Sequence, residues 1–405
     1  MIKREIYLNQ LRDFVDKPFI KVITGLRRSG KSSILTLLSD EFLFNGIDES
    51  NIIFINFESF EFSDIDTSQK LYEYIQAKVV KNRRCYILLD EIQEVANWEK
   101  AVNSLLVDFN ADIYITGSNS RLLSSELATY LAGRYIELHI NTLSFAEYLL
   151  FKHERTHAAV ADRYQEFNQF LRMGGFPVLH TAEYTYETAY KVVFDIYSSA
   201  ILRDTVQRNN IRDIELLERV VKYAFDNVGN KFSAKNVADY FKNQFRKVDL
   251  NTVYNYLNAL VNAFIIYRIP RYDIKGKEIL KTNEKYYVGD QSLIYAVMGF
   301  KDRLISGVLE NIVLLELLRK GYRVFVGKSG NHEIDFIAEQ NELKVYVQVA
   351  YKMTDQTTID REFRALLEIK DHYPKYVVTM DEIWKDNISG VQHMHIADFL
   401  LRDSY

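Results

Sequence analysis

One short segment restricts this chain more than any other, a glycine-rich stretch between an apolar run and an amphipathic helix. Residues 25–32 read Gly-Leu-Arg-Arg-Ser-Gly-Lys-Ser, after the apolar run 19–23 and before the predicted helix from residue 34. Glycines let backbone N–H groups curl around a phosphate, and the start of a helix adds partial positive charge. The segment therefore predicts a phosphate-binding loop between a strand and a helix of an α/β domain.

The loop also assigns expected tasks to its side chains. Lys31 would contact the β- and γ-phosphates of a nucleotide, and the Ser32 hydroxyl would bind Mg²⁺, a metal that prefers oxygen ligands. We therefore expect ATP and Mg²⁺ as cofactors. The expected nucleotide-binding residues are Gly25, Arg28, Ser29, Gly30, Lys31, Ser32, Ser33 and Asp90, and the expected metal ligands are Ser32 and Asp90.

A second motif lies 59 residues after Lys31, where the apolar run 86–89 ends in Asp90 and Glu91. At the end of a strand, Asp90 would belong to the Mg²⁺ shell and Glu91 would act as the general base on the attacking water. The alternative is that both are solvated acids at the start of the next helix. In the first case, loss of Glu91 should spare nucleotide binding and stop hydrolysis.

The pattern of apolar and polar residues divides the chain into four predicted regions. Short apolar runs alternate with amphipathic segments over residues 1–143, which is typical of a parallel sheet with crossover helices. Residues 144–210 have helical spacing, interrupted by a glycine pair and Pro177, and predict a helical lid. Residues 211–298 predict three helices and a hairpin, as in a winged helix-turn-helix or a small three-helix packing domain. Residues 299–405 return to a mixed α/β pattern.

Composition excludes some functions. The formal net charge of the 405 residues is -4, so the whole chain gives no general attraction to nucleic acid or to an anionic membrane. No run of eighteen apolar residues occurs, and Cys85 is the one cysteine, which cannot form an internal disulfide. We expect a cytoplasmic protein without membrane partners.

The motifs together resemble those of a known family. Besides residues 25–33, they are Leu-Leu-Asp-Glu-Ile-Gln at 88–93, Thr-Gly-Ser-Asn-Ser at 116–120, Leu-Ala-Gly-Arg at 131–134, Leu-Ser-Phe-Ala-Glu-Tyr at 143–148 and Gly-Gly-Phe-Pro at 174–177. This combination resembles the AAA-type P-loop ATPases related to the archaeal-ATPase and STAND groups. The resemblance implies an α/β fold with a parallel P-loop sheet, a helical lid, a winged helix-turn-helix and a C-terminal nuclease-like domain.

The same resemblance implies further catalytic residues. Ser118 or Asn119 would be a sensor-like group that orients the attacking water, and Arg134 would be an arginine finger donated to the nucleotide of a neighbouring subunit, which implies a homo-oligomer. Arg134 could instead be a surface ion pair or a partner of a helix dipole. The expected catalytic set is Glu91, Lys31, Asn119 and Arg134.

Double-stranded DNA is an expected partner through the winged helix. Polar side chains suited to phosphates or base edges would line its recognition helix, and basic residues would add local charge. The alternative is a winged helix that contacts proteins. The polar set is Asn251, Thr252, Tyr254, Asn255 and Asn258, and the basic set is Lys242, Arg246 and Lys247.

The C-terminal region resembles the PD-(D/E)xK nucleases, with departures at the metal site. Glu310 and Asp335 occupy the first two acidic positions, but the third motif reads Gln348-Val-Ala350, without the usual glutamate and lysine. Glu333 and Lys352 are candidate substitutes, since alternate residues of a strand share a face. Because two carboxylates and a lysine are needed for metal-dependent cleavage, we do not expect nuclease activity.

The prediction for the whole chain is an ATPase that uses ATP binding and hydrolysis to rearrange its domains or subunits, on DNA. The first alternative is a STAND-like regulatory nucleotide switch that binds protein partners. The second alternative is a metal-dependent nuclease.

Overall fold

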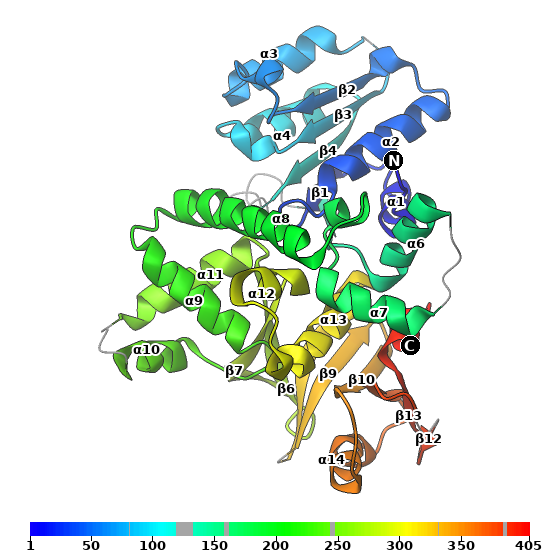
Figure 1. The fold of residues 1–405 in the computed structure, drawn as a ribbon. Helices are drawn as coiled ribbons and strands as arrows, with labels where there is room; N and C mark the ends of the chain where they lie inside the picture. The colour runs from blue at the N-terminus through cyan, green and yellow to red at the C-terminus, as the bar shows by residue number, and fades with distance from the viewer. Residues whose placement is uncertain (81, 119–132, 158–161, 244–247, 331, 384–386) are drawn as a thin grey trace. The chain divides into compact units, whose positions relative to one another are not determined.

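The computed structural model describes residues 1–80, 82–118, 133–157, 162–243, 248–330, 332–383 and 387–405. The chain divides into two units, Met1–Ile140 and Asn141–Tyr405, which are described separately below (Figure 1). Over the described residues, no helix has an apolar stretch long enough to cross a bilayer.

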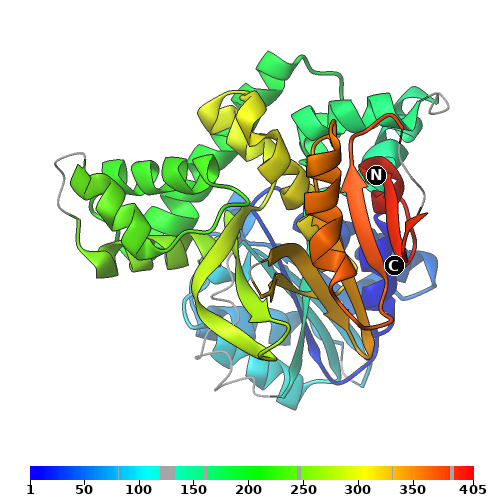
Figure 2. The same ribbon diagram turned by 90° about the horizontal axis from the view of Figure 1, so that it is seen from below.

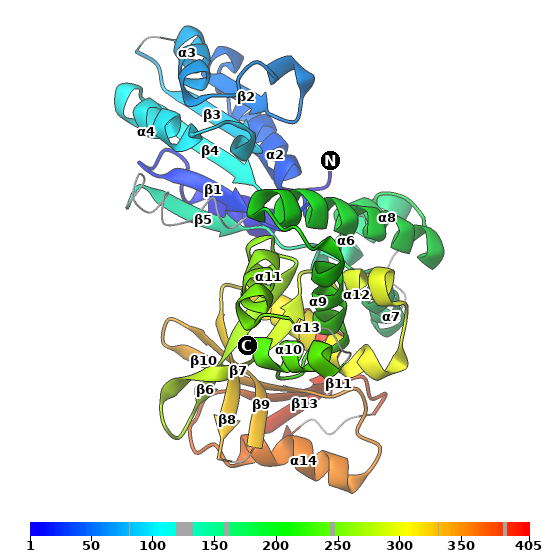
Figure 3. The same cartoon turned by 90° about the vertical axis from the view of Figure 1, so that its left-hand side faces the viewer.

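The first unit is built on a five-stranded sheet in the order β2-β3-β4-β1-β5 (Figure 3). Every pairing in it is parallel, which confirms the predicted parallel sheet. The three central strands are buried along their whole length, as expected for parallel strands covered on both faces. The strands are β1 (Ile20–Thr24), β2 (Ile52–Asn56), β3 (Cys85–Asp90), β4 (Ala111–Gly117) and β5 (Tyr135–His139).

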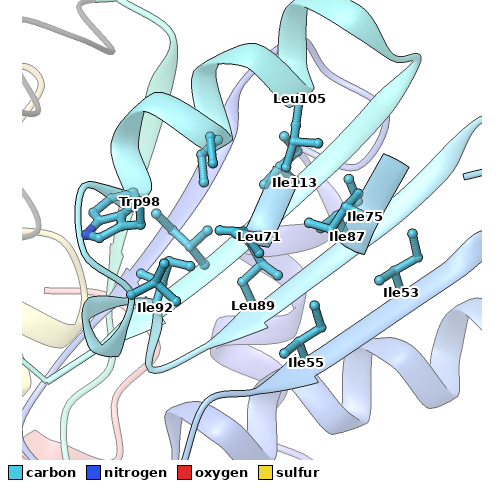
Figure 4. Packing of buried hydrophobic residues seen from close by; sticks show 14 of the residues in the cluster. Ile53, Ile55, Leu71, Ile75, Ile87, Leu89, Ile92, Trp98, Leu105 and Ile113 are labelled. Atoms are coloured by element: carbon cyan, nitrogen blue, oxygen red, sulfur yellow. The ribbon is translucent and has the colours of Figure 1, made fainter. Parts of the chain in front are cut away.

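Helices cover both faces of this sheet because successive side chains of a strand point to opposite faces. On one face, isoleucines such as Ile87 and Ile113 pack against residues of α3 and α4 such as Leu71 and Leu105 (Figure 4). On the other face, the cluster contains residues of α1 and α2. The helices are α1 (Glu5–Arg12), α2 (Lys31–Phe44), α3 (Ser68–Lys78) and α4 (Trp98–Asp108), with short 3-10 turns η1 (Glu49–Asn51), η2 (Phe60–Phe62) and η3 (Ile92–Glu94).

The second unit begins with helices, in agreement with the helical spacing of residues 144–210. The first of them starts with a capping box in which Ser144 and Glu147 bond each other's backbone N–H groups. The second ends at Gly174, where φ is +76° and an added Cβ would lie 2.3 Å from Asp290 Oδ1. The segments are α6 (Phe145–Thr156), α7 (Arg163–Met173), η5 (Pro177–His180), α8 (Tyr186–Ser199) and the π-helical η6 (Ala200–Gln207).

Three further helices and a hairpin follow, close to the predicted positions. They are α9 (Ile214–Asp226), α10 (Ala234–Asn243), α11 (Leu250–Asn262), β6 (Ile266–Asp273) and β7 (Glu278–Val288). The hairpin differs from an independent wing, because β6 also pairs in parallel with β8 (Arg323–Ser329) of the C-terminal sheet. The predicted boundary at residue 298/299 therefore does not separate two sheets, and Figure 2 shows the yellow-green hairpin continuing into the sheet.

That sheet has eight strands in the order β12-β13-β11-β10-β9-β8-β6-β7. Its α14 packs Phe363 and Leu366 against strand residues such as Ile337 and Val377. The remaining elements are α12 (Gln291–Met298), η7 (Asp302–Leu304), α13 (Ile305–Arg319), β8 (Arg323–Ser329), β9 (His332–Gln340), β10 (Leu343–Val349), α14 (Gln356–Leu367), β11 (Lys375–Thr379), β12 (Asn387–Ile388), β13 (Val391–His395) and α15 (Ile396–Leu400).

Candidate nucleotide site

The glycine-rich loop connects the end of β1 to the first residue of α2. Its backbone is left-handed at Arg28 (φ +66°) and at Gly30 (φ +102°), and Gly25 has φ +147°. A Cβ on Gly25 would lie 2.2 Å from the carbonyl oxygen of Ile140, so the loop can pass this point only with glycine. Successive left-handed and right-handed residues direct backbone N–H groups into one concavity, which suits an anion.

Lys31 folds back over this loop from the first turn of α2. It is 3% exposed, and its Nζ lies 3.3 Å from the Gly25 oxygen and 3.4 Å from the Leu26 oxygen. Both distances exceed the usual length of such a bond, so the ammonium is weakly held by the loop. In addition, the buried hydroxyl of Ser29 has no hydrogen-bond partner among the described residues.

The predicted pair of acids lies where β3 ends. Asp90 is 1% exposed, and its Oδ1 accepts a hydrogen bond of 2.5 Å from Thr116 on the neighbouring strand β4. Burial raises the pKa of Asp90, while the hydroxyls of Thr116 and Ser32 lower it again in part. The other oxygen, Oδ2, is buried without a hydrogen bond from the described residues.

Glu91 follows with a left-handed backbone, φ +55°, which is uncommon for a residue other than glycine. Its backbone N–H donates to Thr116 Oγ1 at 2.9 Å, so one hydroxyl positions both acidic residues. Its carboxylate contacts the side-chain amide of Gln93 and lies 3.7 Å from Lys31 Nζ. Backbone strain of this kind concentrates at functional sites, where surrounding contacts hold it in place.

The remaining predicted residues of the loop lie at its surface. Arg28, Ser32 and Ser33 are exposed, with Ser32 close enough to Asp90 to affect its pKa. Ser118 is fully buried just after β4, while Asn119 lies outside the described residues. Sequence reasoning assigned no role to Thr116, although it is the polar residue at the end of the strand that flanks Asp90.

Arg134 and the loop lie at opposite ends of two neighbouring strands. Arg134 directly precedes β5, which runs parallel to β1, whereas the loop follows the carboxyl end of β1. Its carbonyl accepts from Ile20 N, and its exposed guanidinium donates to Asn103 Oδ1 at 2.9 Å. Arg134 is therefore far along the strand direction from the loop of its own chain.

The residues of the loop fit a magnesium-bound nucleotide by three observations. Asp90 Oδ2 and Ser29 Oγ are buried polar atoms without partners among the described residues, and such atoms in folded proteins call for an explanation. Gly25 leaves no room for a side chain where the backbone must turn. Ser32 and Asp90 supply the hard oxygen atoms that Mg²⁺ prefers.

Comparison with known proteins agrees with this geometry. Residues 17–149 match the AAA domain. The chain therefore carries an AAA domain. An uncharacterized protein of Haemophilus influenzae is 41% identical to it over 99% of both chains, and an uncharacterized protein of Methanocaldococcus jannaschii is 32% identical over 85% of this chain and 77% of its own.

A solved structure shows the same fold. The Walker-type ATPase of Pyrococcus abyssi superposes with a TM-score of 0.52 at 15% identity, covering 73% of this chain and 96% of its own. Outside the AAA domain, residues 164–304 match a domain of unknown function, DUF8612. That match runs across the boundaries we predict at 210/211 and 298/299.

The second unit contains a separate cluster of charges, at the positions of the expected nuclease motif. Lys285 of β7 is 2% exposed, and its Nζ lies 3.0 Å from Glu310, 3.0 Å from Glu333 and 3.2 Å from Asp335. The hydroxyl of Tyr287 donates to Glu310 at 2.9 Å. An ammonium group thus lies at the centre of the three carboxylates.

The electrostatics of this cluster follow from burial and from the lysine. Burial and the neighbouring Asp335 raise the pKa of Glu310, and burial also raises that of Asp335. Burial lowers the pKa of Lys285, but Tyr287 and the three carboxylates together keep it well above its usual value. Lys285 therefore remains a cation, and it was not among the residues that we selected from the sequence.

Gln348 borders the cluster: its Oε1 accepts from the backbone N–H of Asp335 at 3.3 Å, and its Nε2 donates to Glu362 at 2.8 Å. Lys352, the candidate substitute, is exposed with its Nζ over the Tyr351 ring. Over the described residues, no group of three His, Cys, Asp or Glu side chains has the arrangement of a metal site. Glu333 does join the cluster, but it does so as a partner of Lys285 and Lys231.

The predicted recognition helix is α11, which exposes its polar residues. Asn251, Tyr254, Asn255 and Asn258 are exposed, and Thr252 is half-buried. The opposite face of α11 is buried, with Val253, Tyr256 and Leu260 in the core. Lys242 is exposed at the end of α10, while Arg246 and Lys247 lie outside the described residues.

Proposed function

We propose that the AAA domain hydrolyses ATP with Mg²⁺ and that the chain couples this reaction to a rearrangement of its domains or subunits. The observation that supports this proposal is the buried group formed by Lys31, Asp90, Glu91 and Thr116 beside the glycine-rich loop. A phosphate loop alone would bind a nucleotide. A second buried carboxylate, held in a strained backbone beside the first, is what hydrolysis additionally needs.

Each residue then has a task in the reaction. The backbone N–H groups from Gly25 to Ser33 and the Lys31 ammonium would bind the phosphates, while Ser32 and Asp90 would hold the metal. When bound, Mg²⁺ would supply stabilisation of negative charge on the phosphates. Glu91 would orient the attacking water and accept its proton; its carboxylate lies 3.7 Å from Lys31 Nζ and accepts a hydrogen bond from the Gln93 amide.

Arg134 extends the proposal to an assembly. Because it lies at the sheet edge away from its own loop, it can stabilise transition-state charge only at the nucleotide of a neighbouring subunit. We therefore propose a homo-oligomer. Its hydrogen bond with Asn103 is exposed to solvent, so breaking this bond on assembly costs little free energy.

Double-stranded DNA is the proposed partner of the second unit. The exposed polar side chains of α11 project from one face of a packed helix, which is the arrangement needed to enter a groove. A regulatory switch that binds proteins would use the same face. DNA binding and protein binding can be distinguished by the effect of salt. Contacts with DNA phosphates make the affinity for DNA, and any stimulation of the ATPase rate by DNA, fall steeply as the salt concentration rises.

The test compares ATPase rates of the wild type, Lys31→Ala, Glu91→Gln and Arg134→Ala with and without double-stranded DNA. We expect Lys31→Ala to lose nucleotide binding, and Glu91→Gln to bind ATP normally while its turnover falls at least about 100-fold. Lys191→Ala, at an exposed lysine that is 75% accessible, is the matched control for charge.

Three results would contradict parts of this proposal. Wild-type turnover retained in Glu91→Gln would remove the base from the mechanism. No recovery on mixing Arg134→Ala with Lys31→Ala subunits, under conditions of subunit exchange, would reject the finger acting between subunits. Rates independent of DNA, with tightly retained nucleotide, would favour the regulatory switch.

A further inference from the structure

Arg4 is a buried arginine outside every motif, and it contacts the phosphate loop. Its side chain is almost completely buried, with the whole residue 3% exposed. Its Nη1 donates a hydrogen bond of 2.8 Å to the carbonyl oxygen of Ser29. The guanidinium also lies over the ring of Tyr7, with Cζ 4.6 Å from the ring centre. A residue near the start of the chain thus reaches the centre of the loop.

The Ser29 carbonyl that Arg4 binds lies within the turn of the phosphate loop. Ser29 lies between Arg28 and Gly30, whose φ angles are both positive, so the backbone reverses on each side of it. In a trans peptide the C=O and N–H groups point in opposite directions. Fixing the Ser29 oxygen toward Arg4 therefore aims the Gly30 N–H away from Arg4, toward the concavity where backbone donors receive a phosphate.

Arg4 is itself held by the packing of the first unit. Its carbonyl oxygen accepts from the N–H groups of Tyr7 and Leu8, at 3.1 and 3.2 Å, at the start of α1. Tyr7 and Leu8 are buried in one cluster with Ile34 and Leu38 of α2. Because α2 begins where the loop ends, Arg4 and the loop are fixed to the same pair of helices.

We propose that Arg4 is a positioning residue that keeps the phosphate loop in its nucleotide-binding conformation. The inference rests on the proposed function, since it concerns the binding of ATP at this loop. Arg4 acts through the backbone of Ser29, and its effect is on the fraction of molecules whose loop is ready to bind. A smaller ready fraction raises the apparent Kd in proportion, while the rate at saturating nucleotide is preserved.

The test uses Arg4→Gln, which shortens the side chain and removes its charge, and Arg4→Lys, which keeps the charge but not the planar guanidinium. Calorimetric titration of the full chain with a non-hydrolysable ATP analogue and Mg²⁺ gives the Kd. We expect a rise of roughly tenfold for Arg4→Gln and about threefold for Arg4→Lys. At saturating ATP, kcat should stay within about twofold of the wild type.

Arg83→Gln is the matched control, because it makes the same charge change at a side chain that is 57% exposed. Its Kd should equal that of the wild type. Titrations at low and high salt separate positioning from long-range attraction, since exposed charges are screened within about 10 Å at 0.1 M salt. The ratio of Kd values between Arg4→Gln and wild type should not depend on salt.

A folded Arg4→Gln protein with wild-type Kd would overturn the inference, as would a ratio that vanishes at high salt. If Arg4→Gln does not fold, a wild-type Kd in Arg4→Lys would overturn it and a raised Kd would support it. A wild type that binds no nucleotide, like Lys31→Ala, would instead overturn the proposed function on which the inference rests.

Discussion

Replacing Lys285 by methionine tests whether the charge cluster of the second unit is a structural element. The substitution removes an ammonium that lies 3.0 to 3.2 Å from Glu310, Glu333 and Asp335, and it leaves a side chain of similar length. Removing one partner of a buried ion pair costs about 3–5 kcal/mol, because the remaining charges stay buried without compensation. We expect Lys285→Met to lower the free energy of unfolding of the second unit by this amount.

The natural control is Lys191→Met, at a pair with the same chemistry but in solvent. Lys191 lies 2.9 Å from Glu187, and their side chains are 75% and 82% exposed. An exposed pair contributes about 0–1 kcal/mol, so this variant should be close to the wild type. The contrast between the two lysines separates the effect of burial from that of the substitution.

Hydrogen exchange measured by mass spectrometry gives the stability of one unit within the full chain. Peptides from α13 and β9, which carry Glu310 and Asp335, should exchange roughly 100- to 3,000-fold faster in Lys285→Met, since about 1.4 kcal/mol corresponds to tenfold. A change below tenfold, equal to that of Lys191→Met, would refute the reasoning. Peptides of the first unit should not change.

Three other predictions follow from single contacts. Thr116→Val should reduce kcat roughly 10- to 100-fold without loss of the fold, measured by ATPase assay and circular dichroism, because it removes the hydroxyl that positions both acids. Gly174→Ala should destabilise the second unit by about 1–3 kcal/mol more than Gly299→Ala in denaturant titrations, since both have positive φ but the Cβ clashes with Asp290 only at the first. His180 is 5% exposed, and burial lowers its pKa from 6.5 to about 4. The native state therefore binds fewer protons at this residue than the unfolded state does. The free energy of unfolding of the wild type should decrease by up to about 3 kcal/mol as the pH falls from 6.5 to 4, and that of His180→Phe should depend less on pH in this range.

The sequence predicted the parallel sheet of the AAA domain, and it named Lys31 and Glu91, which lie 3.7 Å apart in the structure, because both depend on local patterns. Short apolar runs such as 19–23 and 86–89 predicted strands, and the glycine spacing predicted the loop that leads to Lys31 at the start of α2. Thr116 was missed for a physical reason. Its role requires β4 to lie beside β3, where Leu89 pairs with Ile115 and the next pair brings Asp90 to Thr116. A local sequence pattern does not determine the order of strands in a sheet.

Long-range contacts explain the other differences. Lys285 is 50 residues from Asp335 and lies in a hairpin that reads locally as the wing of a separate domain. Only the pairing of β6 with β8 shows that this hairpin belongs to the C-terminal sheet and can supply a side chain to it. Arg4 was missed because an arginine before a helix carries no signal that it will bond a loop 25 residues away.

The phosphate-loop site and the Lys285 cluster contain similar charged groups, but they differ in how many of those groups have partners. Beside the phosphate loop, Asp90 Oδ2 and Ser29 Oγ are buried without partners among the described residues, and Lys31 makes only long contacts. In the second unit, Lys285 has three carboxylates within 3.2 Å. Buried polar groups are costly unless they are paired, so a ligand would stabilise the first arrangement, whereas the ammonium of the second is already paired with carboxylates. This difference supports the proposal that ATP hydrolysis serves a movement of the chain or its partner, because the carboxylates at the positions of the nuclease motif contact a lysine.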